Sequence, residues 1–381
     1  MSKKIFDIQH RCSSSKARSG QVTLASGIVN TPIFMPIGTL GSVKSLTNQD
    51  LLNLGAEIIL GNTYHLWLKP DMDIMNQAGG LHKFGGWKRP ILTDSGGFQA
   101  FSLSKIRKFT EEGVTFRVPA SGEKRFLSPE ISMQIQTTLD SDIALVLDEC
   151  LPAEATLTEA ISAMHRTHRW AKRSKNEFER LKKLKGHNNH LFGIPQGAQF
   201  PDLRKQSALM TMELDFVGYS IGGVANGGEP EDMMYAQVDA QTDILEDFKP
   251  RHLLGVGTPR DIVQMVARGI DMFDCVYPTR NARHGSLIIK VDENSYKTIH
   301  ISATKFATDF TPINEYSKIP ELREYSKAYL CHLFRSKELL AYRLATLQNL
   351  EFYIDLMNTI KSKIKDDTFK YWWESYHQVK N

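Results

Sequence analysis

Short apolar runs alternate with longer polar stretches along most of the chain. Each run holds four to six residues and ends in a polar or glycine-rich turn, after which a helix-like segment follows. Continuous apolar runs of this length between helices are typical of buried parallel strands in repeated strand–helix units. The pattern predicts eight such strands, at 33–37, 57–60, 90–93, 143–147, 190–194, 216–221, 251–256 and 270–275.

Eight strand–helix units favour an α/β fold of the closed (β/α)8 barrel type, and a doubly wound open sheet is the alternative. Helical partners for the strands are visible in the sequence. Residues 48–54 follow Thr47, which can cap a helix, and further helices are expected at 159–185 and 259–268.

Two stretches interrupt the repeat. Residues 101–130 hold two glycines and an alternating Val-Thr-Phe-Arg-Val segment, which predicts an inserted hairpin. Residues 285–381 follow the eighth strand; they begin with a second β-like piece and are expected to continue as helix from about 320 to 362. We therefore expect a catalytic barrel over 1–284 and a C-terminal β/helical subdomain over 285–381, packed on the barrel.

The composition is that of a globular protein. Of 381 residues, 41% are hydrophobic, and Lys plus Arg exceed Asp plus Glu by 47 to 43, a net charge of +4. This excludes disordered, collagen-like and coiled-coil chains and permits a nucleic-acid partner. Four cysteines without a CxxC pair indicate a reducing cytoplasm. We expect no secretory signal, no membrane-spanning helix and no membrane partner.

Candidate chemistry gathers where the predicted strands end. In a (β/α)8 barrel the active residues lie at the carboxyl ends of the strands. Three acids, two amides and three glycines occupy those positions and are expected to meet at one mouth: Asn62, Asp94, Asp148, Gln196, Gly222, Gly223, Gly255 and Asp274.

Each of the three acids could have a structural role instead of a catalytic or ligand-binding one. Asp94 opens the segment Asp-Ser-Gly-Gly-Phe-Gln, whose glycines can bring backbone amides close to a ligand, but Asp94 could also cap the next helix. Asp148 ends an apolar run, and a mouth acid and a helix cap are equally compatible with it. Asp274 is flanked by apolar residues, where an unpartnered carboxylate is costly, so an inward-facing nucleophile or ligand is favoured over a salt bridge.

Two carboxylates on opposite sides of a ribose suit a retaining glycosyl transfer, in which one attacks the anomeric carbon and the other moves protons. If the leaving group is a purine, Asp148 can accept its N–H protons, and Gln196 with the 222–223 backbone can hold its carbonyl oxygen. Phe98 could stack on the base. The two arginines within 279–283 suit phosphate contacts, although a solvated turn is the alternative.

Together these residues resemble the tRNA-guanine transglycosylase family. The matching stretches are 61–66 (GNTYHL), 92–99 (LTDSGGFQ), 128–130 (SPE), 147–150 (LDEC), 218–223 (GYSIGG), 252–257 (HLLGVG), 273–275 (FDC) and 278–283 (PTRNAR). The resemblance implies a pentosyltransferase built on a (β/α)8 barrel. Such an enzyme exchanges guanine at the wobble position of tRNAs with GU-containing anticodons for a 7-deazaguanine, in queuosine biosynthesis.

The resemblance also implies roles for individual residues. Asp274 matches the nucleophile that forms a covalent intermediate with the ribose, and Asp94 matches the general acid/base. Base-binding positions match Ser95, Gly96, Gly97, Phe98, Asp148, Gln196, Gly222, Gly223 and Leu254. Positions that contact tRNA match Gly255, Val256, Gly257, Thr258, Pro259, Arg260, Asp261, Thr279, Arg280, Asn281, Ala282 and Arg283.

Two departures from the family pattern carry further expectations. The four zinc ligands of the family's C-terminal region are replaced, so we expect no metal and no other cofactor; the aligned residues are Ser317, Ile319, Leu322 and Gln348. The loop after Gly223 is one residue longer than usual, over 224–230, which predicts an altered preference around the 7-substituent. The expected base is 7-aminomethyl-7-deazaguanine, with queuine as the alternative, and a homodimer is expected.

Two other functions compete with this one. The first is a non-catalytic, RNA-binding partner subunit of a transglycosylase, which would be free to lose Asp94 or Asp274, whereas this chain keeps both. The second is a barrel lyase or isomerase acting on a small phosphorylated substrate, for which the chain offers no identifiable catalytic lysine or metal triad.

Overall fold

A parallel sheet that closes on itself forms the centre of the molecule. The computed structural model describes residues 4–102, 107–119, 121–224 and 230–379. Pro36 divides the first barrel strand into β4 (Ile33–Met35) and β5 (Ile37–Gly38), and these two pieces form the two ends of the sheet order. β4 pairs with the last barrel strand and β5 with the second, so the predicted eight-stranded barrel is confirmed and the open sheet is wrong.

The other seven barrel strands are short and almost wholly buried. Their positions agree with the predicted runs to within three residues at either end. In chain order they are β6 (Ile59–Gly61), β7 (Ile91–Thr93), β11 (Ile143–Leu145), β12 (His190–Gly193), β13 (Gly218–Ile221), β14 (Arg251–Leu254) and β15 (Met272–Asp274).

Helices follow the strands as the pattern predicts. Thr47 caps α1 through a capping box with Asp50, and Thr156 caps the long α7 in the same way with Glu159. No helix among the described residues is long and apolar enough to cross a membrane. The helices up to the eighth unit are α1 (Asn48–Leu54), α2 (Thr63–Leu68), α3 (Met72–Ala78), α4 (Leu81–Gly85), α5 (Gly97–Ser102), α6 (Pro129–Leu139), α7 (Leu157–Lys185), α8 (Pro201–Met212), α9 (Glu231–Thr242), α10 (Pro259–Ala267) and α11 (Tyr277–Arg283).

Two small antiparallel sheets accompany the barrel. The predicted insertion is confirmed and has three strands rather than two, β8 (Arg107–Phe109), β9 (Val114–Arg117) and β10 (Lys124–Leu127). The N-terminal sheet of β1 (Phe6–Arg11), β2 (Arg18–Leu24) and β3 (Gly27–Thr31) was not predicted. The exposed positions of β1 are polar and charged, so its sequence carries little apolar signal.

The C-terminal region begins with a β-hairpin and continues with separate helices. β16 (Ser286–Lys290) pairs antiparallel with β17 (Ser295–His300), and β18 (His377–Gln378) joins β17. The prediction of one helix over 320–362 is wrong, because the chain turns twice within it. Ser326 caps a new helix, and Lys337 adopts a positive φ of 58°. The elements are η1 (Thr304–Phe306), α12 (Pro320–Glu324), α13 (Lys327–Arg335), α14 (Leu339–Lys365) and α15 (Phe369–Trp373).

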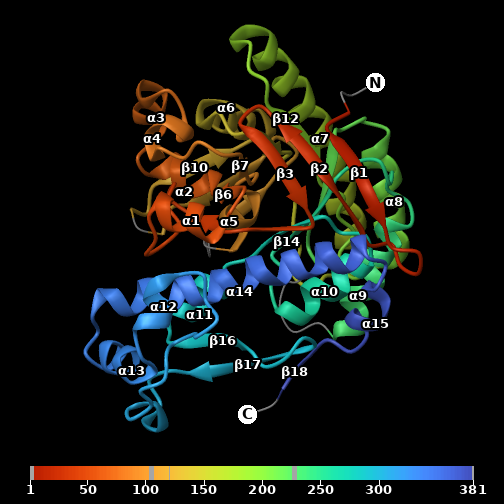
Figure 1. Cartoon of the computed structure of the whole chain (residues 1–381). Coiled ribbons are helices and arrows are strands. Elements are labelled where there is room, and N and C mark those ends of the chain that lie inside the picture. Colours follow the sequence, from red (N-terminus) through yellow and green to blue (C-terminus); the bar gives the residue numbers. More distant parts are fainter. Residues whose placement is uncertain (1–3, 103–106, 120, 225–229, 380–381) are drawn as a thin grey trace.

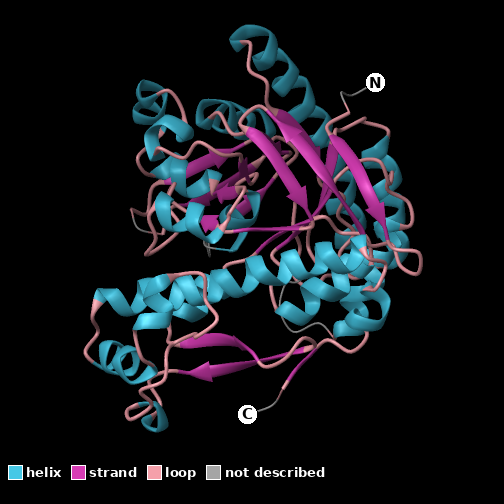
Figure 2. Cartoon of the chain, in the orientation of Figure 1, coloured by secondary structure: helices cyan, strands magenta, loops and turns pink. Residues whose placement is uncertain are grey.

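Helix α14 joins the hairpin to the barrel. Figures 1 and 2 show it lying between the barrel and the β16–β17 pair. It contacts both α1 and α10, which places it where a helix after the eighth strand would lie. Its buried Asn349 donates to the carbonyl oxygens of Pro278 and Ser286, each at 3.0 Å, and Tyr353 donates to the carbonyl of Gly257. The helix therefore holds the loops that follow the last two barrel strands.

The positions aligned with the family's zinc ligands make contacts of another kind. Ile319 and Leu322 are buried in the hydrophobic core. The Ser317 hydroxyl donates to Glu351 Oε2 at 2.5 Å, and Gln348 Nε2 donates to a backbone carbonyl at 3.0 Å. No three His, Cys, Asp or Glu side chains lie together in a metal-binding arrangement within the described ranges. These residues do not fit a zinc ion.

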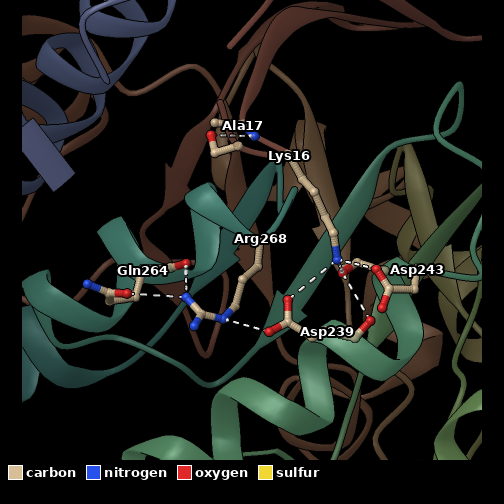
Figure 3. A network of polar contacts seen from close by, with 8 residues as sticks. Lys16, Ala17, Asp239, Asp243, Gln264 and Arg268 are labelled. Carbon is tan, nitrogen blue, oxygen red and sulfur yellow. Dashed lines mark hydrogen bonds and ion pairs between the residues drawn. The ribbon is translucent and has the colours of Figure 1, made fainter. Parts of the chain in front are cut away.

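Polar contacts fix the β1–β2 turn to the barrel, at the end opposite the carboxyl ends of the strands. Lys16 Nζ lies 3.5 Å from Asp239 Oδ1 and 2.5 Å from Asp243 Oδ1, and Arg268 approaches the other oxygen of Asp239 at 3.2 Å (Figure 3). Beside this exposed network, Arg18 is only 1% exposed. It donates to both oxygens of Asp271, at 2.9 and 2.6 Å, just before β15 begins.

We predict that Arg18→Met lowers the free energy of unfolding by about 3–5 kcal/mol, because it leaves the Asp271 carboxylate buried without its cation. Urea titration would measure the change. The matched control is Lys16→Met, whose exposed ion pairs should be worth about 1 kcal/mol or less. An Arg18→Met variant as stable as this control would contradict the assigned importance of the buried pair.

Candidate active site

Asp94 lies at the carboxyl end of β7 within a set of backbone and amide donors. Its Oδ2 accepts from Asn62 Nδ2 at 2.6 Å, and its Oδ1 accepts from the amide of Thr63 at 2.8 Å. Asn62 also caps α2, since its side-chain oxygen accepts from the amide of His65 at 3.0 Å. The end of β6 thus fixes both oxygens of the carboxyl group that follows β7.

The protonation of Asp94 is set by its surroundings. Burial raises the pKa of the Asp94 carboxyl to about 7, the hydrogen bond from Thr63 opposes the rise, and the negative charge of Asp274 adds to it. A carboxyl group with such a pKa is present in both forms near neutrality. Asp94 can therefore either give or take a proton there.

Asp274, the last residue of β15, is 7% exposed. Its Oδ1 lies 2.8 Å from His252 Nε2 and 3.4 Å from the amide of Gly255. His252 is fully buried and its other ring nitrogen, Nδ1, lies 3.0 Å from the hydroxyl of Ser220. Among the described side chains, none makes a hydrogen bond to Asp274 Oδ2, so the contacts of this carboxylate are all made by Oδ1.

A third carboxylate, Asp148, is held by two side chains. Gln196 Nε2 donates to its Oδ2 at 2.6 Å and Ser95 Oγ donates to its Oδ1 at 3.1 Å. Burial raises the pKa of Asp148, while these two hydrogen bonds lower it. The Ser95 hydroxyl in turn accepts from the amide of Gly97 at 3.2 Å. The segment after β7 is therefore connected directly to the segment after β11.

The two glycines after β13 lie against the Gln196 amide. A Cβ at Gly223 would lie 2.5 Å from Gln196 Oε1, and its φ is 64°, so this position requires glycine. The fully buried Arg204 donates to the carbonyl oxygens of Gly222, at 3.0 Å, and Gly223, at 2.5 Å. Because both carbonyls are directed at the guanidinium, the turn has a fixed orientation.

Phe98 and Leu254, two of the predicted base-binding residues, lie in different environments. Phe98, at the start of α5, is 47% exposed. Leu254 is partly buried at the end of β14, and its Cδ1 would lie 3.5 Å from a Cβ on Gly222. Leu254 therefore borders the same turn as Gln196.

The segments expected to contact RNA follow β14 and β15. Thr258 caps α10, and Pro259 occupies its first turn. Arg260 is exposed and pairs with Glu231 at 3.1 Å. Arg283 donates to the carbonyl of Thr279 at 2.8 Å, whereas Arg280 is exposed and pairs with no acid in the described part of the chain. Exposed cationic side chains thus border the mouth beside Asp274.

The sequence analysis did not identify three buried residues that hold the site in place, which are His252, Ser220 and Arg204. His252 and Ser220 lie inside runs that were interpreted only as buried strands, and Arg204 lies in a helix. Ser220 and His252 are polar residues within largely apolar strands, and this pattern could have indicated a functional role for both. No sequence signal identified Arg204, because its partners, which include three backbone carbonyls and the side chain of Gln241, come from other segments of the chain.

Comparisons with known proteins show the family to which the chain belongs. The family model described as queuine tRNA-ribosyltransferase matches residues 12–381. The queuine tRNA-ribosyltransferase of Neisseria meningitidis serogroup A is 49% identical over 362 residues, covering 95% of each chain. Those of Delftia acidovorans and Desulforapulum autotrophicum are 47% and 45% identical, over 96% and 98% of this chain and 95% and 98% of their own. The chain therefore belongs to the queuine tRNA-ribosyltransferase family.

Proposed function

We propose that this chain exchanges guanine at the wobble position of tRNAs with GU-containing anticodons for a 7-deazaguanine base, by double displacement. One observation carries the proposal: Asp94 and Asp274 lie close enough at one barrel mouth for the charge of one to raise the pKa of the other. Retaining glycosyl transfer needs such a pair.

In the first step, a carboxylate oxygen of Asp274 attacks the ribose C1′. The C1′–N9 bond breaks, and its electron pair leaves with guanine, which takes a proton from the Asp94 carboxyl group and leaves Asp94 as a carboxylate. In the second step, Asp94 takes the N9 proton of the incoming base. That nitrogen then attacks C1′ and displaces Asp274. The pKa of about 7 at Asp94 suits a group that gives a proton in one direction and takes it in the other.

Base recognition would fall to the Asp148–Gln196 pair and the turn after β13. A buried carboxylate accepts purine N–H groups, and the Gln196 amide with the Gly223 backbone can hold the carbonyl oxygen. In the unliganded chain Gln196 already donates to Asp148 at 2.6 Å, so the base would have to replace or share this bond. Base edges carry fixed donors and acceptors, which makes these groups selective for guanine-like bases.

The direct test is exchange of radiolabelled guanine into a tRNA with a GU-containing anticodon. Incorporation supports the proposal. Binding of that tRNA without incorporation supports the non-catalytic partner subunit instead. We further propose a homodimer acting in the cytoplasm, with the barrel over 1–284 and the C-terminal unit over 285–381.

We predict that Asp274→Asn abolishes the covalent enzyme–tRNA adduct, because an amide cannot serve as the nucleophile. The adduct is read as a shifted band on a denaturing gel. Gel-shift binding under native conditions should be retained, since the substitution preserves size.

Asp94→Asn is the matched variant for this test, as it also replaces a mouth carboxylate by an amide. It should still form some adduct but turn over slowly. A shifted band with Asp274→Asn and none with Asp94→Asn would reverse the two roles.

We predict that the purified protein holds no stoichiometric zinc, because structural zinc needs about four Cys or His ligands. Ser317 and Gln348 instead form hydrogen bonds, and Glu351 accepts from both Ser317 Oγ and the amide of Lys318. Elemental analysis checks the metal content, and the melting temperature should not change with a strong chelator. Glu351→Gln should lower that temperature, since it weakens the contacts that join the loop to α14. About one zinc per chain would contradict this prediction.

We predict a weaker preference for 7-aminomethyl-7-deazaguanine over queuine than in relatives with the shorter loop. The family resemblance implies that this loop borders the 7-substituent, and here its sequence is one residue longer. Val224, the first residue of the loop, is buried, and residues 225–229 lie outside the described part of the chain. Competition between the two bases for incorporation into tRNA measures the ratio. A ratio equal to that of a shorter-loop relative would show that the extra residue has no effect on selection.

A further inference from the structure

A row of polar side chains crosses three neighbouring barrel strands behind the proposed nucleophile. In the β13–β14 pair, Ser220 lies opposite His252. In the β14–β15 pair, His252 lies opposite Met272, and Leu254 lies opposite Asp274. Since side chains alternate between the two faces of a strand, residues two apart share a face. Ser220, His252 and Asp274 therefore all project to the same face of the sheet.

The contacts within this row are specific in direction. A carboxylate only accepts hydrogen bonds, so His252 Nε2 must donate to Asp274 Oδ1, at 2.8 Å. In a neutral ring the other nitrogen is then an acceptor, and the Ser220 hydroxyl can donate to it at 3.0 Å. Both His252 and Ser220 are fully buried. The Asp274 carboxylate, which can only accept, therefore fixes which ring nitrogen carries the proton, and the serine hydroxyl binds the other nitrogen.

From these contacts we infer that His252 is a positioning residue for Asp274, and that Ser220 positions His252 in turn. This inference rests on the proposed function. The imidazole holds Oδ1, with a weaker contribution from the amide of Gly255 at 3.4 Å. The carboxylate plane is thereby fixed, and Oδ2 is directed at the ribose. This orientation lowers the activation barrier, because the rotation of the carboxylate is already restricted before its oxygen attacks C1′.

Loss of the hydrogen bond from His252 should slow the attack of Asp274 on the ribose and leave tRNA binding unchanged. His252→Leu keeps the apolar volume but removes the hydrogen bond, and should lower the single-turnover rate of adduct formation about 10- to 100-fold. The KM for tRNA should not change, since neither His252 nor Ser220 reaches the surface. Ser220→Ala should lower the same rate by about 3- to 10-fold, the value of one neutral hydrogen bond.

Two further variants separate positioning from mere stability. His252→Gln restores an N–H donor near the position of Nε2, so it should recover part of the rate lost in His252→Leu. Thr346→Val is the matched control, because Thr346 is fully buried and its hydroxyl has no hydrogen-bond partner in the described part of the chain. It should leave the rate of adduct formation at the wild-type value.

The outcomes divide clearly. A lower rate at unchanged KM, with partial recovery in His252→Gln, supports the inference. A wild-type rate in His252→Leu overturns it, and so does equal loss in the Leu and Gln variants accompanied by equal falls in melting temperature. If the wild-type protein forms no adduct at all, the proposed function fails instead, so the two failures are distinguishable.

Discussion

The closure of the parallel sheet is the constraint on which the rest of the structure depends. Because one strand, interrupted at Pro36, pairs with both the second and the eighth strands, all eight carboxyl ends meet around one mouth. Residues separated by 180 positions, such as Asp94 and Asp274, become electrostatic neighbours only through this closure. Burial of these acids is unfavourable by itself, and each is compensated by hydrogen bonds from an adjoining strand end.

The hydrogen bonds that compensate the burial of the acids follow one arrangement around the mouth. Asn62 and Thr63 donate to Asp94, Ser95 and Gln196 donate to Asp148, and His252 donates to Asp274. Each donor comes from a neighbouring barrel segment. The site is thus held by the same strand order that forms the core. A shift of β7, which is followed by both Asp94 and Ser95, would disturb Asp94 and Asp148 at once. This coupling keeps charged groups in place where water is largely excluded.

Much of this could be predicted from the sequence, for physical reasons that differ between elements. The eight barrel strands are buried on both faces, so they appear as continuous apolar runs, and the acids follow directly after them. The N-terminal sheet was missed because its polar face masks the apolar residues, and the helix over 320–362 was wrongly continued through Ser326 and Lys337. Arg204 was missed because its importance lies in contacts between distant segments, which no local pattern encodes. His252 was missed although a polar residue inside a largely apolar strand was a usable signal.

The most direct test of the account is to identify the residue that carries the ribose. Adduct formed with a tRNA would be trapped by denaturation, digested with nuclease and trypsin, and analysed by mass spectrometry. The account predicts a ribose-linked mass on the peptide 269–280, at Asp274 and not at Asp271, whose carboxylate is paired with Arg18. Attachment on the peptide 89–105, which contains Asp94, would contradict it.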